Sequence, residues 1–156
     1  MLFRSEQAAQ AREAIRERAA AVGFDMRIER RDRIWNTFDA HRLLHWAGTL
    51  GGDAQHVLKK ALLAAYFTHG RNPGAREVLL DAAAQAGLDA AEAAAVVDDP
   101  ARFADAVREE EAFWQQAGIH SVPAIVINRR HLISGGQPPE VFEQALRRIA
   151  AESAGG

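Results

Sequence analysis

Two histidines, His41 and His45, are four positions apart in a segment whose apolar residues repeat with a helical period. This spacing places both imidazoles on one face of a helix, where such a pair can chelate zinc. No third ligand and no catalytic glutamate follow at a matching spacing. We therefore expect no metal site, and we interpret the two histidines as residues of a helix surface or of a groove beside it.

The second stretch that could do chemistry is HSVPAIVIN, residues 120–128, in which Val122 and Pro123 open an apolar, β-branched run. A proline brings no backbone N–H, which suits the first residue of an edge strand. Only about 5% of X-Pro bonds in folded proteins are cis. Taken alone, the pair therefore predicts a trans Pro123 at the start of a strand.

Composition limits the classes of function. The chain has 156 residues, of which 48% are hydrophobic, and its 19 basic and 21 acidic side chains give a net charge of -2. These values fit a globular protein with a core and argue against a nucleic-acid partner. No apolar stretch approaches the roughly 20 residues of a membrane span, and the N-terminus has no apolar signal core, so we expect a cytoplasmic protein. The absence of cysteine excludes disulfides, thiolate metal sites and a cysteine nucleophile.

Most of the chain has the pattern of helices. The period and the turn residues predict helices over Glu6–Val22, Ala75–Ala86, Ala90–Val97 and Ala101–Ala117, with two more between Asn36 and Ala65. Glycine follows three of these segments, at Gly23, Gly87 and Gly118, where it favours a helix C-terminus.

Strand patterns flank this helical block. Phe24–Arg30 alternates apolar and polar residues, and Ala124–Ile127 and His131–Ile133 are joined by a short turn. A terminal amphipathic helix follows Pro138 and Pro139. We therefore predict an α/β fold in which Phe24–Arg30 shares a sheet with the two later strands.

Three phrases carry a resemblance to a known family. They are NTFDAHRLLHWA (36–47), LLAAYFTHGRNPGAREVLLDAAAQAGLD (62–89) and GIHSVPAIVINRRHLISGGQ (118–137). With these phrases in this order, the chain resembles the DsbA-like thioredoxin-fold oxidoreductases, and most closely their FrnE-type branch, from about Glu6 to Ala151. Kappa-class glutathione transferases and hydroxychromene-carboxylate isomerases share the same plan.

The resemblance implies an incomplete thioredoxin-like sheet layer with an inserted all-helical subdomain. The expected segments are 1–35, the N-terminal part of the thioredoxin-like domain, 36–118, the helical subdomain, and 119–156, its C-terminal part. The family carries a Cys-x-x-Cys pair, or a serine, on a first strand for which Met1–Ser5 leaves no room. We interpret the chain as a truncated reading frame, with gene degeneration as the alternative, and Ser5 as a helix N-cap.

The resemblance also implies a substrate-binding surface. In such proteins the bond before the proline is cis, so that the backbone of Val122 can pair with an extended peptide or with glutathione. Asn36, Thr37 and His41 would border this groove, although Asn36 or Thr37 could simply cap a helix. Gly135 and Gln137 lie where the glutathione-binding relatives hold their ligand, and an ordinary strand-to-helix turn is the alternative. The site residues expected from the resemblance are Val122, Pro123, Asn36, Thr37, His41, Gly135 and Gln137.

Three functions follow from these observations. The first is a protein thiol-disulfide oxidoreductase by lineage, inactive as this chain stands because it holds no catalytic residue. A glutathione-dependent isomerase or transferase and a non-catalytic peptide-binding module are the alternatives. No cofactor is expected other than glutathione, and the expected partner is glutathione or a protein or peptide that contains a thiol or a disulfide. Nucleic acid and membrane are not expected partners, and a homodimer is compatible with the sequence.

Overall fold

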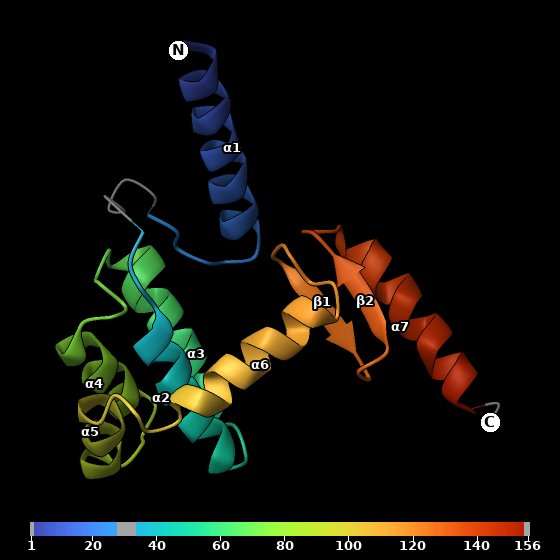
Figure 1. Ribbon diagram of the computed structural model, residues 1–156. Coiled ribbons are helices and arrows are strands. Elements are labelled where there is room, and N and C mark those ends of the chain that lie inside the picture. Colours follow the sequence, from blue (N-terminus) through green and yellow to red (C-terminus); the bar gives the residue numbers. More distant parts are fainter. Residues whose placement is uncertain (1, 28–33, 155–156) are drawn as a thin grey trace. The chain divides into compact units, whose positions relative to one another are not determined.

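The structure is a computed structural model that describes residues 2–27 and 34–154 (Figure 1). Its elements are α1 (Leu2–Ala21), α2 (Phe38–Thr49), α3 (Ala54–Leu63), the π-helix η2 (Ala64–Thr68), α4 (Arg76–Gln85), α5 (Ala90–Asp98), α6 (Ala104–Gln116), β1 (Ala124–Ile127), β2 (His131–Ser134) and α7 (Pro139–Ala154). None of the helices described there combines the length and the apolar character that a membrane span requires.

Contacts divide the chain into two compact units, residues 1–108 and residues 109–156, and each is described by itself. The three segments predicted from the sequence, 1–35, 36–118 and 119–156, concern the organisation of the family fold and stay a prediction.

The first unit contains a helical core. Helix α2 packs against α3 and α5, and α4 packs against the same two helices. Leu43, Ala47 and Leu58, which recur at the helical spacing of three and four residues within their helices, are fully buried. Trp46 is also part of this core. The period of 3.6 residues therefore accounts for the packing of the block.

Glycine residues end the helices where the sequence predicted. After α4, the N–H of Gly87 donates to the carbonyl of Ala84, and the N–H of Leu88 donates to that of Ala83. Gly87 has a φ of 71°, in the left-handed region that costs glycine nothing. These two bonds satisfy carbonyl groups that the end of the helix would otherwise leave without a partner.

The predicted strand at Phe24–Arg30 is wrong for the residues that the structure describes. Residues 24–27 are irregular, and residues 28–30 lie outside the described part. The N–H of Arg27 donates to the carbonyl of Phe67 over 2.9 Å, and the hydroxyl of Thr68 donates to the carbonyl of Asp25 over 2.6 Å. Described strands pair only as β1 with β2, so the backbone of this segment is bound to the π-helix η2 and not to a sheet.

A buried arginine on α2 was not anticipated from the sequence. Arg42 is only 1% exposed, and its guanidinium donates to the backbone carbonyls of Val96, Val97, Asp99 and Arg102 over 2.6 to 3.2 Å. It also forms an ion pair with Asp39 over 2.9 Å. One side chain thus ties α2 to the end of α5 and to the loop that follows.

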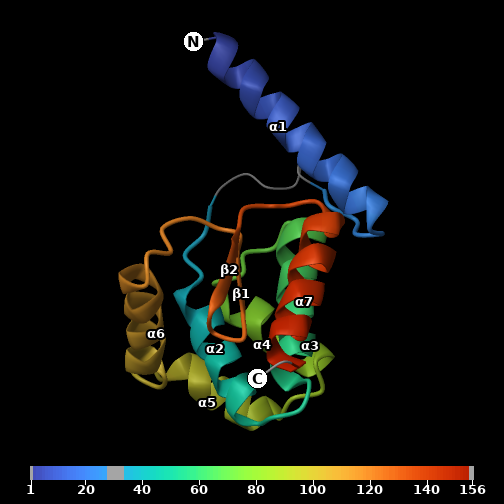
Figure 2. The same ribbon diagram turned by 90° about the vertical axis from the view of Figure 1, so that its right-hand side faces the viewer.

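The second unit contains the β-hairpin and α7. Strands β1 and β2 are antiparallel, with Ala124 opposite Ser134 and Ile127 opposite His131, which confirms the predicted pair of strands. Asn128 and Arg129 in the turn have φ values of 53° and 58°. Figure 2 shows the two strands side by side with α7 running along them.

Candidate functional site

The loop between α6 and β1 contains the Val-Pro pair. Helix α6 ends at Gln116, and in the turn after it the N–H of Gly118 donates to the carbonyl of Gln115 over 3.0 Å. The Val122–Pro123 peptide bond is cis, and the side chain of Val122 is 89% exposed. The carbonyl of Pro123 accepts a hydrogen bond of 2.8 Å from the N–H of Gly135. The loop is therefore tied to the end of β2 while Val122 stays at the surface.

The hydrogen bond to Pro123 also sets which groups of β1 face outward. In an antiparallel pair, neighbouring residues direct their N–H and C=O groups alternately toward and away from the partner strand. The carbonyl of Pro123 is bonded to Gly135, just after β2, so the backbone groups of Ile125 and Ile127 point toward β2. Those of Ala124 and Val126 point away from it. No third strand pairs with this edge among residues 2–27 and 34–154. Within the described residues, the backbone beyond the Val-Pro pair therefore forms a sheet edge without a partner strand.

A hollow of about 350 Å³ lies next to this loop, lined by Gln115, Ile119, His120, Ser121 and Val122. No pattern in the sequence predicted this hollow directly. The sequence contained one indirect signal. Gly118, which marks a helix C-terminus, comes only four positions before Val122, so the last turn of that helix must lie near the Val-Pro pair.

The candidate residues near α2 belong to the first unit. The side chain of Asn36 accepts a hydrogen bond of 2.9 Å from the N–H of Phe38, whereas the side chain of Thr37 makes no capping bond. His41 is exposed, and the ring of His45 packs on Phe103 with 5.5 Å between the ring centroids. Within the described residues, no three or more His, Asp or Glu side chains are grouped to hold a metal ion.

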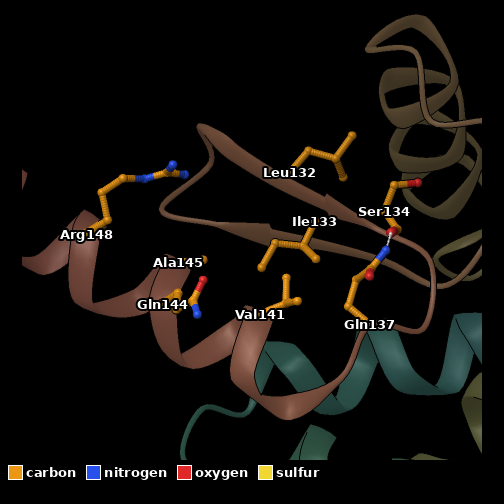
Figure 3. Close-up of a pocket in the computed structure, with 8 residues that line it drawn as sticks. All are labelled: Leu132, Ile133, Ser134, Gln137, Val141, Gln144, Ala145 and Arg148. Atoms are coloured by element: carbon orange, nitrogen blue, oxygen red, sulfur yellow. Dashed lines mark hydrogen bonds between the residues drawn. The ribbon is translucent and has the colours of Figure 1, made fainter.

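Gly135 and Gln137 lie in the second unit, at the turn between β2 and α7. The side-chain amide of Gln137 donates to the carbonyl of Ser134 over 2.9 Å (Figure 3). Gly135 has a φ of 80°, which lets the chain reverse there. This geometry favours the structural interpretation of the pair as a strand-to-helix turn.

The structure therefore brings the site candidates together in two sets. Val122, Pro123, Gly135 and Gln137 lie in one unit, where Pro123 and Gly135 are hydrogen-bonded. Asn36, Thr37 and His41 lie at the start of α2 in the other unit. A groove that both sets border stays a prediction.

The two possible capping residues can be separated by mutation. We expect Asn36→Ala to lower the free energy of unfolding by about 1 kcal/mol, because the N–H of Phe38 loses its acceptor. Thr37→Ala should change it by only a few tenths of a kcal/mol, since its hydroxyl caps nothing. Urea unfolding monitored by circular dichroism measures both. Equal losses in the two variants would contradict the assignment of Asn36 as the capping residue.

Comparison with known proteins identifies the family. Residues 4–147 match the family described as DSBA-like thioredoxin domain. The chain belongs to the DsbA-like thioredoxin family. Its fold is the DsbA form of the thioredoxin fold, present here as helices and a two-stranded sheet, in agreement with the predicted incomplete sheet and helical insertion.

A solved structure is similar to this DsbA-like chain. The probable DsbA oxidoreductase SCO1869 from Streptomyces coelicolor is 39% identical in sequence, with a TM-score of 0.83 over 94% of this chain. The DsbA-like chain spans 62% of the length of that protein. Among curated proteins, none matches the chain.

Proposed function

We propose that this DsbA-like chain carries the substrate-docking part of a FrnE-type, cytoplasmic protein thiol-disulfide oxidoreductase. The observation that carries the proposal is the exposed Val122, next to the open edge formed by Ala124 and Val126. An extended peptide can add to such an edge through backbone hydrogen bonds, with side-chain pockets providing selectivity. The hollow beside His120 is suited to one side chain of the docked peptide.

The chemistry that goes with docking needs sulfur atoms from elsewhere. In thiol-disulfide exchange, a thiolate attacks one sulfur of a substrate disulfide, the other sulfur leaves as a thiolate, and a second thiol resolves the mixed disulfide. The sequence contains no cysteine, so none of its side chains can perform either attack. We propose that substrate docking is the activity that the residues of this chain support.

Peptide binding tests the proposal. We expect an unstructured, cysteine-containing peptide to shift the backbone amide NMR signals of residues 119–126. Val122→Pro, which removes the N–H of that residue, should weaken binding about tenfold, as expected when a backbone hydrogen bond is lost and its partner stays desolvated. Val122→Ala keeps the backbone groups and should bind within about threefold of the unchanged protein.

The hairpin signals of β1 and β2 show in each variant whether the second unit is folded. Equal binding by Val122→Pro and by the unchanged protein, or shifts confined to other segments, would contradict backbone docking. A parallel titration with glutathione tests the alternative chemistry. Saturable shifts at Gly135 and Gln137 with glutathione, and none with the peptide, would support the isomerase or transferase interpretation.

A further inference from the structure

A second hollow lies between β2 and α7, and we name it the β2–α7 groove. It has a volume of about 640 Å³, within the range of small-molecule sites. It is lined by Leu132, Ile133, Ser134, Gln137, Val141, Gln144, Ala145 and Arg148. All of these residues belong to the second unit, and Figure 3 shows them around the hollow.

The helical side of the groove is a single stripe of α7. Val141, Gln144, Ala145 and Arg148 follow the spacing of three and four residues that places side chains on one helix face. Val141 and Arg148 are seven residues apart, which corresponds to about 10 Å along the helix axis. The groove is therefore elongated.

Apolar side chains line the middle of the groove, together with the amide of Gln144. Ile133 points from β2 toward Val141 in Figure 3, and Ala145 is the next residue of the stripe. Because alanine is small, it leaves space between the helix and the strand. Such a surface favours an aliphatic chain, because burial of apolar area contributes a favourable free energy of about 25 cal/mol per Å².

The two ends of the groove differ in charge. Arg148 is the only charged residue in its lining, and Figure 3 places it at the opposite end from Gln137. The amide of Gln137 is already bonded to Ser134, so that end is closed by a neutral pair. The Nε atom of Arg148 lies 3.9 Å from a carboxylate oxygen of Glu152, which is a long contact for an ion pair. Arg147, in contrast, is paired with Glu143 over 2.7 Å.

We propose that the β2–α7 groove binds an aliphatic carboxylate of medium chain length. The chain lies on Ile133, Val141 and Ala145, and the carboxylate accepts hydrogen bonds from the guanidinium of Arg148. A planar guanidinium suits this role because it can donate two parallel N–H bonds to one carboxylate. The β2–α7 groove shares no lining residue with the hollow beside Val122.

The probe is decanoate, added to the full chain below its micelle concentration and followed by backbone amide NMR. We expect saturable shifts confined to residues 132–134 and 141–148, with a dissociation constant on the order of 1 mM. Decanamide, which has the same chain and no charge, should bind about tenfold more weakly. This comparison uses the unchanged protein, so it does not depend on the folding of any variant.

Two matched variants locate the carboxylate. Arg148→Gln should weaken decanoate binding about tenfold, and Arg147→Gln, on the same helix but outside the groove, should stay within about twofold. Decanoate and decanamide binding equally well would overturn the proposal. Equal effects of the two variants, shifts outside the groove, or the absence of a saturable shift would overturn it as well.

Discussion

Arg42→Ala is expected to lower the free energy of unfolding of the first unit by about 2 to 5 kcal/mol, because buried carbonyl groups lose a donor and a large buried side chain is removed. The guanidinium of Arg42 supplies hydrogen bonds to four backbone carbonyls, two at the end of α5 and two in the loop that follows. Alanine removes this donor from all four carbonyls, of which that of Asp99 keeps a bond from the N–H of Arg102, and it opens a space where the side chain was. Because typical domains are stable by only about 5 to 15 kcal/mol, partial unfolding in buffer is compatible with this expectation.

Arg76→Gln is the matched control. Arg76 pairs with Asp98, near the same end of α5, but both side chains are more than half exposed. Its hydrogen bond lowers the pKa of the Asp98 carboxyl, which shows that the two groups interact. At the surface, solvent screens such a pair, so the unfolding midpoint in urea should change little. Similar midpoints for Arg42→Ala and Arg76→Gln would contradict the role assigned to Arg42.

Gly74→Ala is expected to destabilise the first unit by about 1 to 3 kcal/mol, as overpacking of a fixed site does. A Cβ atom at Gly74 would collide with the backbone carbonyl oxygen of Asn36. The N–H of Gly74 is also held by the side chain of Asn72 over 2.9 Å, so the loop cannot move away freely. The collision would push the loop from the start of α2, where Asn36 caps the helix. Urea unfolding gives the loss, and the amide shifts of Phe38 report the displaced cap.

Gly48→Ala is the control for this variant, because a Cβ atom there would meet only the side-chain amide of Gln55. That amide donates an exposed hydrogen bond of 3.1 Å to the carbonyl of Leu44, which its displacement would break, whereas alanine has a higher helix propensity than glycine by about 1 kcal/mol. The two effects should nearly cancel. If Gly74→Ala were as stable as Gly48→Ala, the close approach of the loop to Asn36 would not be a constraint on the fold.

The sequence predicted the elements whose signals are local. The helical period located the inner faces of α2 and α3, and the run Ala124–Ile127 has the bounds of β1. The alternation at Phe24–Arg30 predicted a strand wrongly, because a period of two residues describes which side chains face inward but not what the backbone pairs with. The backbone of this segment is bonded to η2, and neither the helical period nor the strand period of the sequence distinguishes a π-helix.

The candidate site could be predicted only in part for a similar reason. Val122 and Pro123 were located by the family resemblance, and their exposure next to an open edge came from the structure. Arg42 is bonded to backbone carbonyls 54 to 60 positions away. Every residue has a backbone carbonyl, so the sequence does not show which of them will accept. Hollows such as the β2–α7 groove depend on the distance between two elements, which periodicity does not specify.

The contrast between the hairpin and the Arg42 contacts has a consequence for the order of folding. Strands β1 and β2 are joined by three residues, so their pairing closes a very short loop and can form within about 1 to 10 μs. The contacts of Arg42 with the end of α5 join positions 54 to 60 apart, and they bear the larger entropy of closing a long loop. In a refolding experiment, amide protons of the hairpin should therefore become protected from exchange before those at the end of α5.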